Sequence, residues 1–124
     1  MTNRCYERRW WKRPRKIVVG GIIYRYSLLD HPKYRELRVY RENEKEFAFR
    51  LRLTWPETWA IDLFRPKTVA YIIGWHEGQS HKEPATLWLQ EELSLFQGLL
   101  DMFFPPEEQE QREWFLERVG TVPH

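Results

Sequence analysis

A period of two across residues 34–53 constrains the fold of this chain more than any other stretch. Apolar and polar residues alternate on both sides of the polar segment ENEK, with apolar side chains at Leu37, Val39, Phe47, Phe49, Leu51 and Leu53. Such alternation is typical of two β-strands that each bury one face. Because directly paired residues share a face, a short loop at residues 43–45 would pair Val39 with Phe49 and Leu37 with Leu51.

Three further segments also favour strands. The segment KIVVGGIIYRY (16–26) is rich in β-branched and aromatic residues, and its Gly20-Gly21 pair predicts a two-residue hairpin turn or a bulge in one long strand. Residues 58–64 and 67–75 are expected to form two more strands, joined by a turn at residues 65–67. Residues 16–75 are therefore predicted to form an antiparallel β-meander of five to six strands.

The sequence changes to a helical period after Pro84. Apolar residues recur at spacings of three and four as far as Phe104, which predicts an amphipathic helix. A second apolar stripe on the same helix comprises Trp88, Leu95, Leu99 and Met102. One sheet face cannot cover both stripes, so the second is expected to meet another helix or a partner. Pro105 and Pro106 begin a second helix, which is expected to end just before Gly120.

Together these segments predict one α+β domain over residues 1–124. It would consist of a basic arm (1–15), the meander (16–75) and two C-terminal helices (84–119) packed on one face of the sheet. No apolar run approaches the ~18 residues that span a bilayer, the N-terminus has no apolar signal segment, and one Cys excludes an internal disulfide framework. We therefore expect a soluble, cytoplasmic protein without a membrane partner.

Charge is unevenly distributed along the chain. Residues 1–16 carry seven basic side chains and one acidic one, whereas residues 69–124 carry three basic and ten acidic, although the net charge is only +2. Such asymmetry favours contact with nucleic acid, or attraction between oppositely charged surfaces within the fold or between subunits.

The segment RRWWKRPRK (8–16) contains the first candidate binding residues. These are Arg8, Arg9, Trp10, Trp11, Lys12, Arg13 and Arg15. Basic residues around two tryptophans suit phosphate contact and base stacking, and Pro14 keeps the segment extended because it disfavours helix at the residue before it. Alternatively, the two tryptophans fold back as core anchors and leave the cations exposed.

The polar face of the 34–53 hairpin supplies a second candidate surface, formed by Arg38, Tyr40, Arg50 and Arg52. The predicted register places Arg38 directly opposite Arg50, and like charges so placed destabilise a sheet. Either Asp62 lies nearby and offsets them, or the face binds an anionic partner. Arginine and tyrosine on one sheet face are the residue types with which binders of single-stranded nucleic acid contact phosphates and stack on bases.

No stretch specifies a catalytic chemistry. His76, Glu77 and His81 have the residue types of the HExxH zinc motif, but the two histidines lie five residues apart, so they would not share a helical face. Cys5 has no neighbouring histidine, and no pair of acidic residues stands out as general acid and base. No metal or cofactor is expected, and a non-catalytic role is favoured.

Two function hypotheses of different class follow, with an enzyme as the third. The leading one is a small nucleic-acid-binding or regulatory protein that uses the basic arm and the hairpin face, with single-stranded nucleic acid as its partner. The second is a protein-interaction module, such as a phage-type or mobile-element regulator. It would dock on a larger host machine such as the transcription apparatus, or on a second copy of itself, through the apolar and acidic C-terminal helices. The third is a metal-dependent hydrolase that uses His76, Glu77 and His81.

Overall fold

The computed structural model of the chain describes residues 8–80, 84–120 and 122–123. Within these ranges six strands form one sheet in the order β1-β3-β4-β5-β6, and β2 also pairs with β3. The strands are β1 (Arg8–Arg9), β2 (Arg15–Val19), β3 (Ile22–His31), β4 (Tyr34–Arg41), β5 (Phe49–Thr54) and β6 (Thr86–Trp88). The pairings are antiparallel except between β5 and β6, which run parallel.

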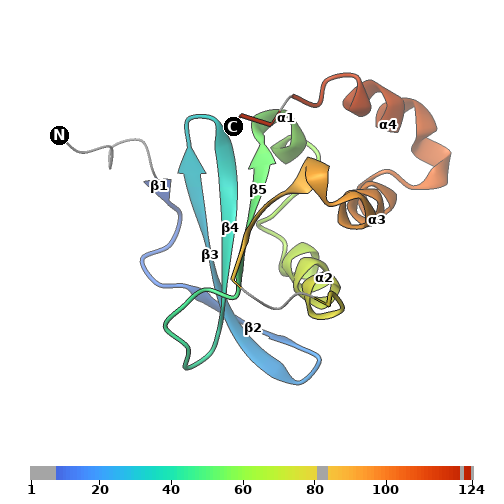
Figure 1. Cartoon of the computed structure of the whole chain (residues 1–124). Coiled ribbons are helices and arrows are strands. Elements are labelled where there is room, and N and C mark those ends of the chain that lie inside the picture. Colours follow the sequence, from blue (N-terminus) through green and yellow to red (C-terminus); the bar gives the residue numbers. More distant parts are fainter. Residues whose placement is uncertain (1–7, 81–83, 121, 124) are drawn as a thin grey trace.

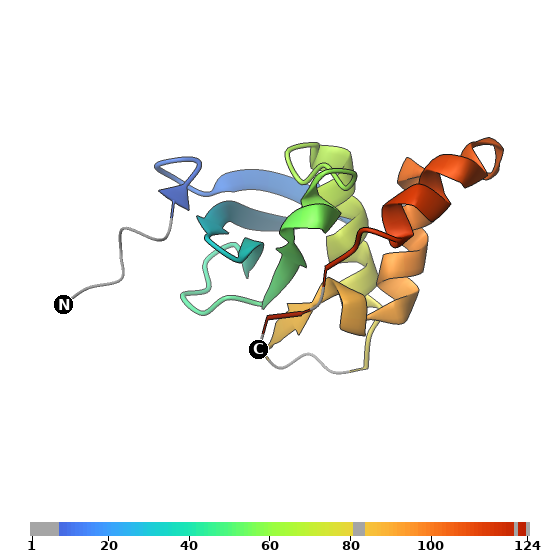
Figure 2. The ribbon, with the colours of Figure 1, turned by 90° about the horizontal axis from the view of Figure 1, so that it is seen from above.

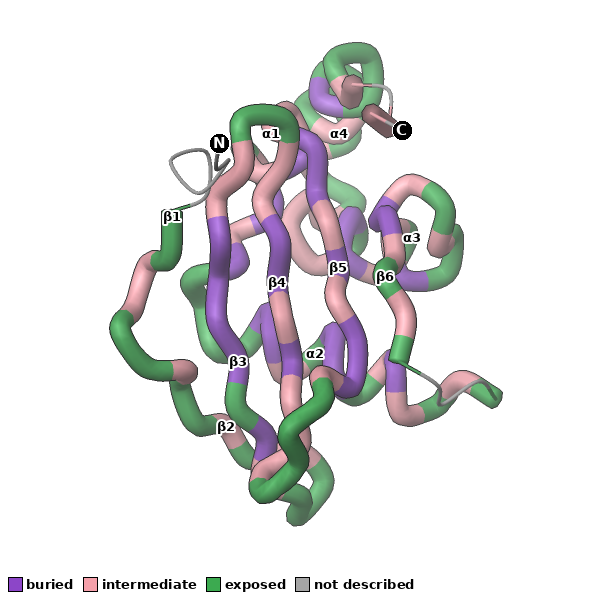
Figure 3. Tube along the Cα trace, turned by 60° about the vertical axis from the view of Figure 1, so that its left-hand side comes forward, coloured by how far each residue is buried: buried purple, intermediate pink, exposed green. Residues whose placement is uncertain are grey.

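Helices form a second layer on one face of this sheet (Figures 1 and 2). They are α1 (Trp55–Thr58), α2 (Pro66–Glu77), α3 (Leu93–Phe103) and α4 (Gln109–Leu116), with 3₁₀ turns η2 (Leu89–Glu91) and η3 (Pro106–Glu108). In Figure 3, β3, β4 and β5 lie in front and α2 and α3 lie behind them, so no helix of the described ranges covers the front face. The predicted α+β class, a mostly antiparallel sheet followed by C-terminal helices, is confirmed.

The hydrophobic core lies between the sheet and the helical layer. Its fully buried members include Leu28, Leu37, Val39, Leu51, Leu53, Val69, Ile72, Ile73, Leu95 and Leu99. The strand members alternate in sequence and those of α2 recur at helical spacing, so each element turns one side toward the same interior. None of the helices within the described ranges has the length and apolar character that a bilayer-spanning segment requires.

Both predicted hairpin features are confirmed. Gly20 and Gly21 have φ values of 59° and 80° and form a two-residue turn between β2 and β3. The register of β4 and β5 pairs Leu37 with Leu51 and Val39 with Phe49. Their connection is longer than the predicted loop and covers residues 42–48, because Phe47 leaves the strand and its ring packs 4.0 Å from the guanidinium carbon of Arg50.

The strands predicted over residues 58–64 and 67–75 were wrong, so the antiparallel meander ends at Thr54. Pro56 and Glu57 form α1 directly after β5, and residues 59–65 are an irregular connection. Pro66 then begins α2, where proline is tolerated because its missing N–H would be unpaired in a first helical turn. The β-branched residues that suggested a strand, such as Val69 and Ile73, lie four apart and face the core of a helix.

The long helix predicted from Ala85 to Phe104 was also wrong in its first half. Residues Thr86–Trp88 are extended and pair with β5, and α3 starts only at Leu93. The helix over Leu93–Phe103 and the one after Pro105-Pro106 agree with the prediction. The helical layer therefore holds four helices, two of them before the predicted pair, within the part of the chain that the structure describes.

Candidate nucleic-acid interface

The uncovered face of the sheet, which we call the open face, is formed by alternate residues of three strands. Its central residues are Arg25, Ser27, Tyr34, Glu36, Arg38, Tyr40, Arg50 and Arg52. Arg38 lies directly opposite Arg50, as predicted, and Glu36 lies directly opposite Arg52. Three arginines on two neighbouring strands are therefore placed around a single carboxylate.

Glu36 binds two of the three arginines. Its Oε2 accepts from Nη2 of Arg38 at 2.6 Å, and its Oε1 accepts from Nε of Arg52 at 2.9 Å. The carboxylate is almost fully buried beneath them, with 5% of its side chain exposed. Burial alone would lower the pKa of Arg38, but the hydrogen bond and the negative charge of Glu36 raise it above its ordinary value. Arg38 therefore remains charged on the open face.

The sequence prediction did not recognise Glu36 as the offsetting carboxylate and offered Asp62 for that role, with an anionic partner as the alternative. Asp62 lies on the connection before α2, where its Oδ1 accepts the backbone N–H of Phe64 at 2.9 Å and its Oδ2 is 3.7 Å from Arg65. The signal for Glu36 was present in the sequence. The register that pairs Arg38 with Arg50 also pairs Glu36 with Arg52, and residues two apart on a strand share a face.

Arg50 is the arginine of the three that has no carboxylate partner among the described residues. Its guanidinium carbon lies 4.0 Å from the ring centroid of Phe47, so the cation rests on an aromatic face. Its Nε is buried without a hydrogen-bond partner. A buried donor without an acceptor is costly, and no carboxylate of the described residues compensates the positive charge of Arg50.

Aromatic rings gather on the open face at the end where β3 turns into β4. The rings of His31 and Tyr34 are stacked with centroids 4.3 Å apart, and Trp88 of β6 meets Tyr34 edge-on at 5.3 Å. Arg52 lies over both Tyr34 (4.5 Å) and Trp88 (5.5 Å). Half-buried Tyr40 is paired with Arg25 nearer the other end. The face thus combines cations with rings along its length.

The two arm tryptophans pack against the domain rather than standing free. Trp10 meets Phe64 edge-on at 5.0 Å, and Trp11 meets Tyr26 edge-on at 5.8 Å. Arg8 and Arg15 lie over these rings, with guanidinium carbons 4.2 Å from Trp10 and 4.5 Å from Trp11. The arm residues Arg8, Arg9, Lys12, Arg13 and Arg15 are all exposed. The rings serve the fold, as in the alternative interpretation, and the cations face solvent.

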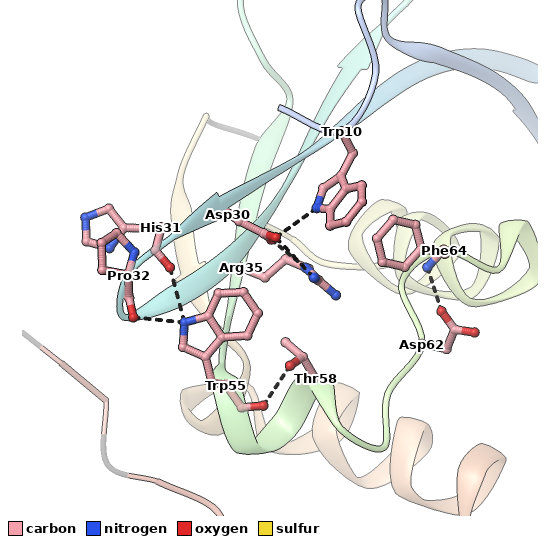
Figure 4. A network of polar contacts seen from close by, with 9 residues as sticks. All are labelled: Trp10, Asp30, His31, Pro32, Arg35, Trp55, Thr58, Asp62 and Phe64. Carbon is pink, nitrogen blue, oxygen red and sulfur yellow. Dashed lines mark hydrogen bonds and ion pairs between the residues drawn. The ribbon is translucent and has the colours of Figure 1, made fainter. Parts of the chain in front are cut away.

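A polar network fixes the arm to the helix-covered side of the sheet (Figure 4). Asp30 accepts from Nε1 of Trp10 at 2.9 Å and from Nε of Arg35 at 2.7 Å. The Arg35 guanidinium carbon lies within 6 Å of three ring centroids, at 5.7 Å from Trp10, 5.2 Å from Trp55 and 4.9 Å from Phe64. Asp30 thus joins the arm, β3 and β4.

The predicted partner stripe lies largely inside the fold. Leu95 and Leu99 are fully buried, Trp88 is 8% exposed on the open face, and Met102 is half-buried. This is a correction: Leu95 and Leu99 of α3 face the core and Trp88 lies on β6, so the four residues do not form the single exposed helical stripe that was predicted. The helical layer instead exposes Trp59 (67%) and Trp114 (53%), which the sequence prediction missed. They border a cavity of about 280 Å³ that is also lined by Phe103 and Phe104.

The residues of the hydrolase hypothesis make separate contacts, although Nδ1 of His76 lies 3.7 Å from Oε2 of Glu77. His76 is 4% exposed in the last turn of α2, and its ring is stacked on Phe49 at 4.2 Å. Glu77 binds Arg41, with 2.8 Å between Oε2 and Nη2, and His81 lies outside the described residues. Burial and the neighbouring Glu77 raise the pKa of Tyr24 above its ordinary value. Within residues 8–80, 84–120 and 122–123, no three His, Cys, Asp or Glu side chains are grouped to hold a metal ion.

Comparison with protein-family models, curated protein sequences and solved structures finds no match for this chain. Its function is therefore inferred from its own residues and their geometry.

Proposed function

We propose that the protein binds single-stranded nucleic acid on the open face of its sheet. The observation that carries the proposal is the pair of directly opposed arginines, Arg38 and Arg50, on a face that no described helix covers. Among the described residues, one carboxylate, that of Glu36, forms ion pairs with these three central arginines. A bound phosphate would supply the negative charge that no described carboxylate brings to Arg50.

The cations at the margins of the open face extend this surface. Arg9 is paired with Leu29, and Lys16 is paired with Arg25, so both belong to strands beside β3 and both are exposed. Arg9 of the arm and Lys16 of β2 thus add charge at the margin of the interface, while the arm's tryptophans anchor it on the helix-covered side. Stacking on bases would come from Tyr34, Tyr40 and His31 on the sheet.

Affinity should depend steeply on salt if phosphates occupy the open face. With about four phosphate contacts, the logarithm of the association constant should fall with the logarithm of salt concentration with a slope near −3, since each single-strand contact contributes about 0.7. Fluorescence anisotropy with a labelled thymidine oligonucleotide between 50 and 300 mM salt measures this slope. A flat dependence, or no binding at 50 mM, would refute the proposal.

Arg50→Ala is the sharpest test of the face because Arg50 forms no ion pair with the residues that the structure describes. We expect about tenfold weaker binding and a slope shallower by about 0.7, with thermal stability nearly unchanged. Arg52 is a poorer probe because it binds Glu36 and packs on Tyr34. Arg65→Ala is the matched control: its side chain is 68% exposed on the helical side, and binding should not change. Equal effects of both substitutions would place the ligand elsewhere.

A second candidate function, self-association, is favoured by the aromatic groove of Trp59, Phe103, Phe104 and Trp114. The adjoining helix α4 carries exposed Glu110 and Glu113, and we take a second copy as the occupant because its first sixteen residues are strongly basic. Light scattering should then show a dimer at 50 mM salt that Trp114→Ser dissociates. A monomer at all concentrations would exclude this function.

A further inference from the structure

The turn between β2 and β3 is a rigid, projecting tip. Gly20 and Gly21 both have positive φ, at 59° and 80°, and Val19 pairs directly with Ile22 across the turn. A two-residue turn of this kind matches the natural twist of the two strands and holds them tightly. Figure 1 places the turn at the opposite end of the molecule from α4. The shape of the tip is therefore determined by the backbone conformation of the turn and does not require a binding partner.

The tip exposes aliphatic side chains on a basic stem. Val18 is 58% exposed on the side of the open face, and Ile22, which lies on the opposite side with its partner Val19, is 46% exposed at the turn, although β-branched side chains of this kind are usually buried. One step down the hairpin, exposed Lys16 and Arg25 are directly paired. Ile17 and Val19 lie on the side opposite Val18 and pack against the core, so the hairpin is fixed to the domain, while Val18 and Ile22 at its end remain exposed.

The outward side of the tip continues the open face. Lys16 pairs with Arg25, Arg25 pairs with Tyr40, and Val18 follows Lys16 at the next position on the same side of the strand. A strand of nucleic acid on the open face would therefore meet the apolar tip at one end. Aliphatic side chains do not bind phosphate, but they do pack against the flat faces of bases, as the apolar wedges of DNA-bending proteins do.

We propose that this tip packs against the last base pair of a duplex whose single-stranded extension lies on the open face. The protein would then recognise the junction between single-stranded and double-stranded nucleic acid. This inference rests on the proposed function. An anionic membrane would also suit basic and aliphatic groups, but the cations here follow the sheet toward Arg38 and Arg50 rather than surrounding the tip, which favours an elongated polyanion.

The test compares three labelled probes at one salt concentration: a single strand of about 12 nucleotides, a blunt duplex, and the same duplex with that strand as an extension. The native protein should bind the extended duplex about tenfold more tightly than the single strand, the equivalent of one added stacking contact. The double substitution Val18→Thr with Ile22→Thr keeps β-branched side chains but makes the tip polar. It should abolish this preference and leave single-strand affinity within about twofold.

Leu93→Ser is the matched control, because Leu93 is 75% exposed on α3 in the helical layer, and it should leave all three affinities unchanged. Failure of every probe to bind would overturn the proposed function together with this inference. Equal binding of the single strand and the extended duplex would overturn the inference alone. The inference alone would also be overturned by a tip variant that keeps its junction preference but no longer binds vesicles containing phosphatidylserine, because that result would show that the tip contacts lipid.

Discussion

Replacing Asp30 with alanine is expected to lower the free energy of unfolding by about 3 kcal/mol, because it leaves a largely buried guanidinium without its partner. Asp30 accepts from Arg35 at 2.7 Å and from Trp10 at 2.9 Å, and the side chains of Asp30 and Arg35 are only 16% and 13% exposed. The substitution would orphan Arg35 among aromatic rings and release the indole N–H that fixes the arm. Urea unfolding followed by circular dichroism measures the change.

Two comparisons make the Asp30 result specific. Glu44→Ala removes a carboxylate that is 55% exposed and lies 3.9 Å from Arg41, and it should change stability by less than about 0.5 kcal/mol, as exposed ion pairs do. Asp30→Asn keeps an acceptor for Trp10 but removes the charge, so it should fall between the alanine variant and the native protein. A loss below about 1 kcal/mol in the alanine variant would show that ring packing alone holds the arm.

The free energy of unfolding should fall by roughly 3 kcal/mol as the pH rises from about 4.5 to about 7, and Glu57 is the cause. Its side chain is fully buried, its Oε1 accepts the backbone N–H of Thr54 at 2.8 Å, and burial raises its pKa from 4.5 to about 7. In this window the folded state keeps a proton that the unfolded state has released. The free energy of unfolding is therefore highest at a pH where Glu57 is protonated in both states. It decreases as the pH rises through the pKa of about 7 that Glu57 has in the folded state.

Glu57→Gln should remove this pH dependence. Glutamine keeps an oxygen to accept from Thr54 and cannot ionise, so the variant should match the native protein near pH 4.5 and exceed its stability above pH 7. Urea unfolding of both proteins at several pH values measures the difference, and subtracting the two curves cancels the other titrating groups. Glu110→Gln, at an exposed site on α4, should leave the curve unchanged. Parallel curves for Glu57→Gln and the native protein would contradict the assignment.

The strands that could be predicted are those whose signals lie within the strand itself or in the adjoining turn. Alternation fixes which residues of β4 and β5 face the core, and that choice also fixes the register that pairs Arg38 with Arg50. Two consecutive glycines fix the β2–β3 turn because only glycine readily adopts positive φ twice. The open face was predictable for the same reason, since it is the complement of the buried one.

The wrong predictions lie where the local residue types favoured one secondary structure and packing against distant parts of the chain favoured another. Residues 67–75 are rich in β-branched residues, which favour strands. Val69 and Ile73 nevertheless recur at helical spacing after Pro66, and their packing against the sheet stabilises α2 instead. The capping pattern of Thr54 and Glu57 was present in the sequence as a signal for α1. The contact of Trp10 with Phe64 could not be read from the sequence, because it depends on how the chain returns after β5.

The parallel pairing of β5 with β6 determines when the open face is complete during folding. β2 to β5 are joined by short connections and can associate early, whereas β6 reaches β5 only after α1 and α2 have crossed the far side of the sheet. Trp88, which borders Arg52 on the open face, arrives with β6. The aromatic end of that surface is therefore assembled in the same step as the helical layer behind it, and chains that have not closed their core cannot yet present it.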